Sequence, residues 1–345
     1  MDRDVPAAVT YWTGVWDPAR EAISKEVQTI RRSLSPRSTI VSFSPGQRSA
    51  VLLDAAVVRL SARRWVTLRV LAAALERLGT ITHLFGPADA WHLLRAVGRR
   101  PVIFTVVAPG PPLDAELYAK VCCFVPETEQ LGAALRRAGI AGDRIRVVPP
   151  GIDLTRFAPA PYPQDAPFRI LFASTPSDPR EIAPRGVPLL VELARQRSDI
   201  EIVLLWRQWG SGTAASRALR ALKLPSNVIV MPQDVADMPA VYAGVHAVAA
   251  CFTEGAGKSC PNSIVEGLAC GRPAIVSPEC GIAEEIRSAG AGVVAPRTVT
   301  ALAEQVEELR DSYRERARAA RGLAVASFDV NRLLRSYQEL YLRFS

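Results

Sequence analysis

Strand-like and helix-like segments alternate along almost the whole chain, and this alternation constrains the fold more than any other feature of the sequence. Short runs rich in β-branched and aromatic residues, such as residues 81–85 and 121–125, are followed by helical patterns such as residues 128–138. The same order returns later, with a strand pattern at residues 168–173 and a helical one at 187–197. The alternation predicts an α/β fold, in which mainly parallel sheets are covered by helices on both faces.

Turn-forming residues interrupt this alternation between positions 149 and 167, beginning with Pro149, Pro150 and Gly151. This composition predicts a boundary between two domains. We expect a first domain over residues 1–158 and a second over residues 159–329. Residues 330–345 form a final helix in this prediction, because apolar residues recur there at helical spacing: Leu333, Leu334, Tyr337, Leu340 and Tyr341.

The chain has 345 residues, 49% of them hydrophobic and 22% charged, which suffices for two domains with sizeable cores. No apolar run is long enough to span a bilayer, and the first residues lack the apolar centre of a signal peptide. The six cysteines lack paired metal-binding spacing, which predicts reduced thiols and no metal site. These features predict a cytoplasmic protein.

The formal charge of +8 raises the question of an anionic partner. No nucleic-acid motif accompanies the charge, so a solvated Arg-rich surface is the first interpretation, and attraction to anionic lipid or to a phosphorylated substrate is the second. A basic cluster with an aromatic residue stands out at positions 59–69, and it consists of Arg59, Arg63, Arg64, Trp65 and Arg69. This cluster predicts either a patch for peripheral contact with the inner face of a membrane or a solvated helix with one packed side.

A Gly-rich polar loop begins at Glu254 and precedes a short helical pattern. Asn262 and Ser263 are good helix caps, so we expect the helix to begin there. Its free N–H groups and the positive end of its dipole suit a phosphate or diphosphate. Glu266 lies one turn inside, where its carboxylate can accept hydrogen bonds from a ribose, and Gly271 ends the helix. Such loops also occur in α/β proteins that bind nothing there.

Two segments carry a resemblance to a known family. The run Glu266-Gly-Leu-Ala-Cys-Gly-Arg-Pro273 resembles the donor-sugar signature of retaining nucleotide-sugar glycosyltransferases with the GT-B fold, glycosyltransferase family 4. The stretch from Pro149 to Asp153, with the Phe and Pro that follow it, resembles the interdomain segment of the same family. The resemblance implies two Rossmann-like domains whose parallel sheets face an interdomain cleft, and a final helix that crosses back to the first domain.

The same resemblance implies transfer of a sugar, with retention of anomeric configuration, from a UDP-, GDP- or ADP-linked donor, whose base the sequence does not distinguish. The acceptor would be a glycan, a lipid-linked molecule or a small molecule, with no cofactor, no metal and no nucleic acid. A non-catalytic relative that binds nucleotide sugars or glycans is the alternative, because two family positions differ here. The family's first Glu corresponds to Lys258, with Glu254 further back, and its usual Arg corresponds to Thr175.

Candidate site residues follow from this comparison. Arg185 matches the family's Lys before a helix, so Arg185 and Lys258 are expected to stabilise the leaving diphosphate. The residues expected to bind the donor are Arg207, Ser259, Asn262, Ser263, Ile264 and Glu266. Gly281 and Glu284 lie in a turn that resembles the family's Gly-Ile-Pro-Glu, where a structural role is the preferred interpretation.

The first domain offers three candidates for the acceptor side. Gly14 follows the first predicted strand, Trp16 belongs to an aromatic run that also includes Trp12, and His83 lies in a later strand. Trp16 can stack on a sugar or on a lipid-linked acceptor, although core packing explains it equally well. A structural role is the default for His83. The strand at residues 101–107 lacks the His that many relatives carry, so no general base is assigned.

Overall fold

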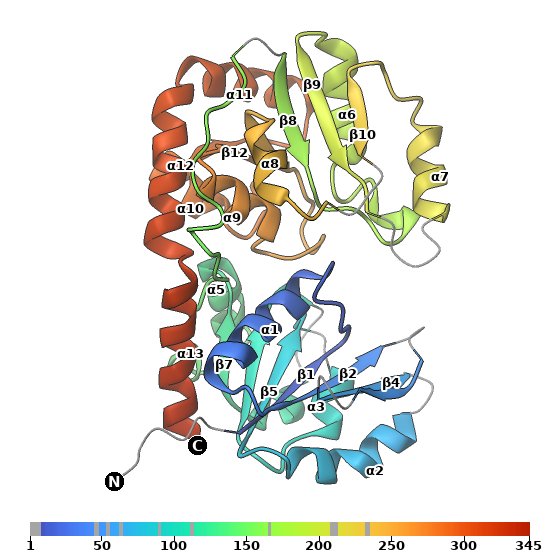
Figure 1. The fold of residues 1–345 in the computed structure, drawn as a ribbon, viewed down its shortest axis with the longest axis vertical. Helices are drawn as coiled ribbons and strands as arrows, with labels where there is room; N and C mark the ends of the chain where they lie inside the picture. The colour runs from blue at the N-terminus through green and yellow to red at the C-terminus, as the bar shows by residue number, and fades with distance from the viewer. Residues whose placement is uncertain are drawn as a thin grey trace. The chain divides into compact units, whose positions relative to one another are not determined.

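The chain folds into two compact units. A computed structural model describes residues 8–44, 48–52, 56–61, 65–88, 91–110, 114–164, 167–207, 213–231 and 235–345. The first unit comprises Met1–Gly151 together with Asn331–Ser345, and the second comprises Ile152–Val330 (Figure 1). The chain therefore passes into the second unit after Gly151, earlier than the sequence-based boundary after residue 158, and returns after Val330.

The first unit is built on a seven-stranded sheet in the order β3-β4-β2-β1-β5-β6-β7. Neighbouring strands are parallel except β3 and β4, which form an antiparallel edge pair that the sequence analysis missed. The strands are β1 (Val9–Thr13), β2 (Thr39–Ser44), β3 (Ala50–Leu52), β4 (Val57–Ser61), β5 (Ile81–Gly86), β6 (Val102–Val106) and β7 (Val121–Pro126). The helices are α1 (Ala22–Leu34), α2 (Trp65–Glu76), α3 (Trp91–Ala96), α4 (Ala115–Ala119) and α5 (Glu129–Arg137).

The last helix, α13 (Val330–Phe344), completes the core of the first unit. Its apolar face packs with residues of β1, β5 and α1, and the buried members are Leu333, Tyr337, Leu340 and Tyr341. Polar bonds add to this packing, because the hydroxyl of Tyr341 lies 2.7 Å from Nδ1 of His83 and that of Tyr337 lies 2.7 Å from the Thr105 hydroxyl. The helix thus binds the sheet through matched apolar and polar partners.

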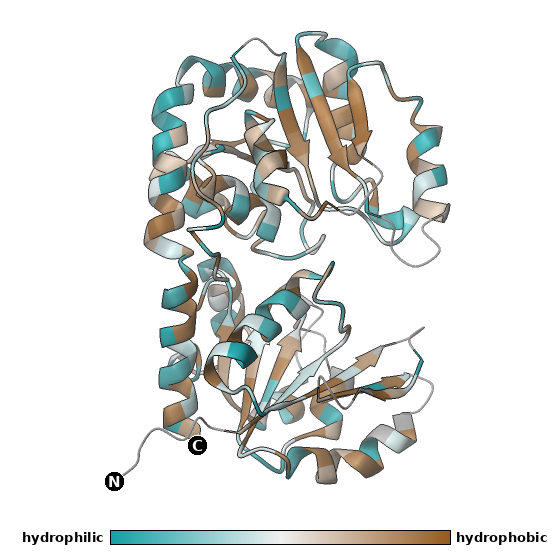
Figure 2. Ribbon diagram, in the orientation of Figure 1, coloured by the Kyte–Doolittle hydropathy of each residue, from teal (hydrophilic) through white to brown (hydrophobic). Residues whose placement is uncertain are grey.

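The second unit has a six-stranded parallel sheet in the order β10-β9-β8-β11-β12-β13. The strands are β8 (Phe168–Phe172), β9 (Ile200–Leu205), β10 (Val228–Met231), β11 (Ala247–Ala250), β12 (Ala274–Val276) and β13 (Gly292–Val294). The helices are α6 (Val187–Gln196), α7 (Thr213–Ala221), α8 (Met238–Ala243), α9 (Asn262–Ala269), α10 (Ala283–Ala289), α11 (Val299–Asp311) and α12 (Tyr313–Ser327), with a short 3-10 turn, η4 (Pro179–Glu181). Figure 2 shows its strands as mostly hydrophobic and α11 and α12 as mixed, as expected for a sheet covered by helices.

The strand order of the second unit marks where a ligand would bind. The order reverses at β8, since β9 and β10 lie on one side of it and β11 to β13 on the other. In open parallel sheets, ligands bind beyond the carboxyl ends of the strands at such a reversal. The segments that leave the ends of β8, β9 and β11 therefore form the first place to examine.

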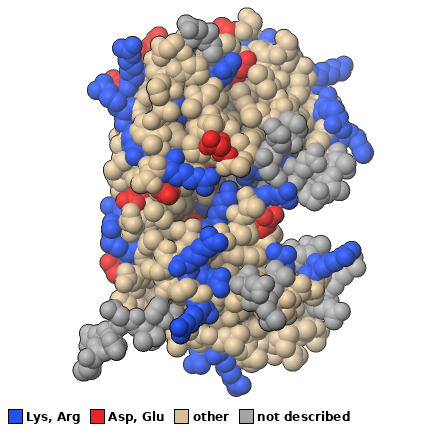
Figure 3. Space-filling model, in the orientation of Figure 1, with Lys and Arg blue, Asp and Glu red and all other residues tan. Residues whose placement is uncertain are grey.

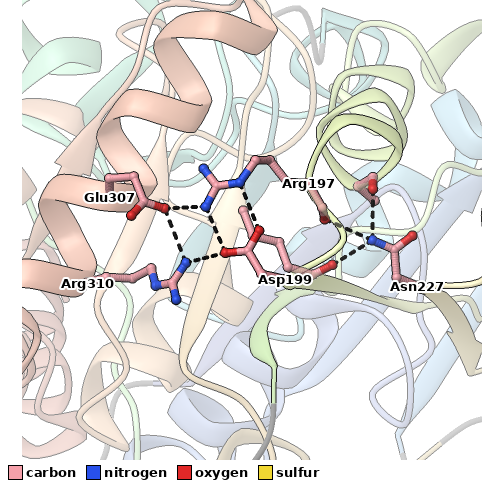
Figure 4. A network of polar contacts seen from close by, with 7 residues as sticks. Arg197, Asp199, Asn227, Glu307 and Arg310 are labelled. Atoms are coloured by element: carbon pink, nitrogen blue, oxygen red, sulfur yellow. Dashed lines mark hydrogen bonds and ion pairs between the residues drawn. The ribbon is translucent and has the colours of Figure 1, made fainter.

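An ion-pair network lies at the amino-terminal end of the strands in this sheet, and Figure 4 shows it at close range. Asp199 accepts hydrogen bonds from Arg197 at 2.7 Å and from Arg310 of α11 at 2.5 Å, and Glu307 bonds both arginines. The side-chain amide of Asn227 donates to the backbone carbonyls of Ala194 in α6, of Arg197 after it, and of Ile200 at the start of β9. These contacts join the start of β9 to α11, away from the carboxyl ends of the strands.

Candidate functional site

The loop between β11 and α9 is shaped by glycines and by contacts with the segment before α6. Gly255 and Gly257 adopt φ values of +75° and +74°, which favour glycine. The N–H of Thr253 donates to the carbonyl of Pro184 at 2.8 Å. A Cβ on Gly281 would lie 2.7 Å from the Ser259 backbone oxygen, so Gly281 lets the loop approach the turn after β12. The loop thus contacts both the segment before α6 and the turn after β12.

Helix α9 begins at Asn262, and its cap is Pro261. The helix thus begins where the sequence predicts, although Pro261 takes the cap position and the Oδ1 of Asn262 accepts from the Lys258 ammonium at 2.9 Å. Within the described residues no side chain caps this helix end. The first-turn N–H groups and the Lys258 ammonium together form a local concentration of positive charge, as an anion requires.

The remaining expected loop and helix residues differ in their exposure. Ser259 is buried beside Gly281, and Ser263 is half-buried in the first turn. Ile264 is fully buried in the core and its N–H donates to the Pro261 carbonyl at 3.0 Å. Ile264 therefore packs in the core and is not a donor contact. Glu254 is exposed near the start of the loop.

Glu266 is buried one turn inside α9. Its Oε2 accepts a hydrogen bond of 2.8 Å from the hydroxyl of Tyr242, a fully buried residue of α8. Burial raises the pKa of Tyr242 well above its usual value, and the Glu266 carboxylate raises it further. The hydroxyl therefore keeps its proton and remains a donor. The sequence did not single out Tyr242, because nothing in its short helix distinguishes it from a core tyrosine.

Arg185 lies just before α6, where two neighbours hold its guanidinium. Nη2 pairs with Glu181 at 2.7 Å, and Nη1 donates to the Ser174 hydroxyl at 2.8 Å, just beyond β8. The next residue, Gly186, has φ +78°, and a Cβ there would lie 2.4 Å from the Cys251 carbonyl oxygen. The chain before α6 therefore packs closely against the end of β11. A ligand anion at Arg185 would share the guanidinium with Glu181.

Arg207 and Thr175 lie at the ends of β9 and β8. The Thr175 hydroxyl donates to the Leu205 carbonyl at 2.7 Å and accepts from the Arg207 N–H at 3.0 Å. The Arg207 guanidinium lies 3.9 Å from the sulfur of Met238 in α8. Arg207 therefore extends toward the helix that carries Tyr242, and its charge lowers the pKa of Tyr242 against the larger effect of burial.

The acceptor-side candidates of the first unit differ in their burial. His83 is fully buried, and its Nε2 lies 2.8 Å from the Thr105 hydroxyl, so both ring nitrogens have partners inside the core under α13. Trp16 is also buried in that core. Both are structural residues, contrary to the acceptor-side expectation. Gly14 is half-buried after β1, and a Cβ there would have open space around it.

The described residues contain no group of three or more His, Cys, Asp or Glu side chains arranged to hold a metal ion. No helix among them is both long enough and apolar enough to cross a membrane.

Comparison with known proteins gives one family match, which lies within the second unit. The family model described as glycosyl transferases group 1 matches residues 184–312. No curated protein matches the chain. The chain is similar to a glycosyltransferase from Rickettsia africae ESF-5, with a TM-score of 0.74 and 17% identity over 99% of each chain.

Two other solved structures are similar over nearly their full length. Anabaena HepE in complex with UDP and glucose has a TM-score of 0.72 and 14% identity, over 97% of this chain and 99% of that one. Sucrose-phosphate synthase from Thermosynechococcus elongatus has a TM-score of 0.75 and 16% identity, over 97% and 98%. These likenesses confirm the predicted fold class, an α/β fold with two domains and parallel sheets of the GT-B type.

Proposed function

We propose that this protein transfers a sugar from a nucleotide-sugar donor to an acceptor, with retention of anomeric configuration. One observation carries the proposal: the buried carboxylate of Glu266 lies one turn behind the uncapped start of α9, with the Lys258 ammonium at that helix start. This combination suits a nucleoside diphosphate, whose diphosphate needs positive charge and whose ribose needs a hydrogen-bond acceptor. The segment lies within the residues that match the glycosyl transferases group 1 model.

Six of the candidate residues then have a role in binding the donor. Lys258 and the first-turn N–H groups of Asn262 and Ser263 would bind the diphosphate, and Glu266 would accept from the ribose. Arg185 would add a cation to the leaving group, and Arg207 would lie beside the nucleotide. The base remains uracil, guanine or adenine. The complex of the Anabaena neighbour with UDP and glucose supports a nucleotide-sugar ligand for this fold.

Charge on the departing diphosphate grows as the bond to the sugar breaks. Fixed cations and N–H groups stabilise that charge more in the transition state than in the ground state, which lowers the barrier. A divalent metal is not needed for this step when Arg185, Lys258 and the helix start supply the positive charge. We therefore propose a transferase without a metal cofactor.

A panel of UDP-, GDP- and ADP-sugars, each tested for release of free nucleotide in the presence of sugar acceptors, would test the proposal. Release of one nucleotide together with an α-to-α or β-to-β product, read by nuclear magnetic resonance, is the expected result. Inversion at the anomeric carbon would overturn retention. Binding of a nucleotide sugar without any turnover would favour the non-catalytic relative.

A specific observation keeps that relative as the second candidate. Thr175, at the position where the resemblance expects an arginine, uses its hydroxyl to connect the ends of β8 and β9. Lys258 stands where the resemblance expects a glutamate. Either change would be tolerated more easily in a protein that binds a sugar nucleotide without transferring the sugar.

We also propose that helix α2 contacts an anionic membrane, which would suit a lipid-linked acceptor. Val66 and Val70 are 74% and 71% exposed, and the neighbouring Leu71 and Leu78 are exposed too. Arg69 is exposed along the same helix, and its acidic residue, Glu76, is buried. An apolar helix face interleaved with arginine is typical of helices that lie in a bilayer surface.

Not all residues of the basic cluster expected at positions 59–69 belong to this exposed face. Arg59 turns inward, with Nη2 donating to the Trp16 carbonyl at 3.2 Å, so it is not part of the exposed face. Arg63 and Arg64, and the side chain of Trp65, lie outside what the structure describes. Figure 3 shows Lys and Arg spread over the visible face of both units, so charge alone does not mark a membrane surface, and the apolar side chains of α2 carry the argument.

Flotation with vesicles tests this contact. Val66→Ser combined with Val70→Ser should reduce binding to vesicles containing phosphatidylglycerol several-fold, while the control Val325→Ser, an exposed valine of α12, should leave it unchanged. Equal loss with both variants, or equal binding to vesicles of phosphatidylcholine alone, would contradict the contact.

A further inference from the structure

We propose that Tyr242 is a positioning residue that orients the Glu266 carboxylate toward a ribose, and that Arg272 fixes Tyr242 in turn. The inference rests on the donor role proposed above for Glu266. It adds two residues to that site, neither of which the sequence pattern marks, and it makes the selectivity for ribose over deoxyribose depend on them.

The first step is the bond between the two side chains. Tyr242 is fully buried, and its hydroxyl donates to Oε2 of Glu266 at 2.8 Å. Its ring packs edge-to-face against Phe157, with ring centroids 6.1 Å apart. A glutamate side chain has three rotatable bonds, so a carboxylate at the edge of a pocket needs a fixed donor to present one orientation. A rigid phenol held in the core supplies that donor.

The second step is the attachment of Tyr242 itself. Arg272 is only 1% exposed, an unusual burial for a guanidinium. Its Nε donates to the Tyr242 carbonyl at 2.7 Å, and its Nη2 donates to the Pro161 carbonyl at 2.9 Å. Burying a charge is costly unless its donors are satisfied, so these bonds fix the geometry strongly. Arg272 therefore anchors the C-terminal end of α8, the helix that carries Tyr242.

The third step is that Glu266 and Arg272 come from one continuous segment. Glu266 lies in α9, and Arg272 follows it after a turn at Gly271, whose φ is +73°. The N–H of Arg272 donates to the Gly267 carbonyl at 2.8 Å, which closes this turn. The α9 segment thus contacts α8 twice, through a carboxylate and through a guanidinium. A change at either contact would alter the direction of the Glu266 carboxylate without removing it.

The experiment compares Tyr242→Phe with the control Tyr337→Phe, a fully buried tyrosine of the first unit, whose hydroxyl lies 2.7 Å from the Thr105 hydroxyl. Calorimetry would give the affinities of UDP, GDP and ADP, and of their 2′-deoxy and 3′-deoxy forms. The wild type should bind one ribonucleotide about ten-fold more tightly than a deoxy form, since a hydrogen bond to a charged group is lost. Tyr242→Phe should reduce this ratio to about two-fold or less, and Tyr337→Phe should keep it.

The possible results separate this inference from the proposed function. A wild type that binds ribo and deoxy forms equally, or binds none of them, removes Glu266 as the ribose ligand and the proposal with it. A wild type that discriminates, together with a Tyr242→Phe variant that discriminates equally, overturns the positioning role alone. Arg272→Lys gives a second measurement: it should lower the same ratio, and a melting temperature recorded for each variant identifies loss of fold.

Discussion

The hydroxyl of Thr175 accepts a hydrogen bond from the backbone N–H of Arg207 at 3.0 Å and donates to the Leu205 carbonyl at 2.7 Å. This threonine therefore joins the carboxyl ends of β8 and β9. It cannot supply the positive charge that the resemblance places at its position. The candidate cations for a leaving diphosphate are Arg185, Lys258 and Arg207.

Glu266→Ala should weaken binding of the preferred nucleotide sugar about ten-fold and leave the fold intact. Loss of a charged hydrogen-bond acceptor costs roughly 1.5–3 kcal/mol. Titration calorimetry would measure the change, with Glu284→Ala as the control, because that carboxylate is exposed on α10 and pairs with Arg287. Unchanged donor affinity in Glu266→Ala would remove this residue from the site.

Activity should persist in excess chelator, and Arg185→Ala should lower kcat more than it raises KM for the acceptor. The reason is that charge on the diphosphate is greatest in the transition state. Arg180→Ala is the control, since Arg180 lies close by in η4 but is exposed and paired with Asp178. Complete loss of wild-type turnover on metal removal, restored by magnesium or manganese, would refute the metal-free mechanism.

Gly186→Ala should damage the site more than Gly290→Ala, although both glycines have positive φ, +78° and +65°. Each substitution carries the strain of a left-handed alanine, about 1 kcal/mol. Only at Gly186 would the new Cβ meet a backbone atom, the Cys251 oxygen at 2.4 Å, whereas at Gly290 the space is open. Thermal melts and donor affinity of the two variants give the difference. Equal effects would show that the close contact relaxes freely.

Stability should fall as pH drops below about 6.5, and His83 should account for part of the fall. Burial lowers the pKa of His83 well below its usual value of 6.5, so the unfolded chain takes up a proton that the folded chain does not. Each such group reduces stability by up to about 1.4 kcal/mol per pH unit in this range. Urea unfolding between pH 7.5 and 5 would measure the slope, which His83→Asn should reduce. An identical slope in the variant would contradict this.

Asp199→Asn should lower the stability of the second unit by about 0.5–1 kcal/mol at low salt, and by less at high salt. Arg197, hydrogen-bonded to Asp199, lowers the pKa of this carboxyl, and Arg310 adds to the effect. The pair is partly exposed, so screening limits its value. Asp178→Asn, whose partner Arg180 is fully exposed, is the control for an isolated pair. A loss independent of salt would point to packing instead of charge.

Local patterns predicted much of the fold. The alternation of strands and helices is confirmed in both units, because parallel strands buried on both faces leave strong apolar runs in the sequence. Two features were missed or wrong. The edge pair of β3 and β4 is too short to show a period, and the chain enters the second unit after Gly151, seven residues before the expected boundary.

The site was harder to predict than the fold, for physical reasons. The glycines of the loop and the start of α9 can be predicted from residues close by in the sequence. The burial of a side chain depends instead on elements far away in the chain. His83 and Trp16 were acceptor-side candidates, but both are buried in the core that α13 completes. In the proposed site, Tyr242 acts through its bond to Glu266, and Arg272 acts through its bond to the Tyr242 carbonyl. The spacing of residues in the sequence does not predict such contacts.

The bond between His83 and Tyr341 joins positions 258 residues apart, and this separation has a consequence for biosynthesis. A ribosome adds roughly 5–20 residues per second, so about 10 to 50 s pass between synthesis of the two partners. The whole second unit is synthesised in that interval, including all six strands of its sheet. The unit that is translated first is thus the last to complete its core, and a nascent chain without α13 would expose the unfinished face of its first sheet to chaperones.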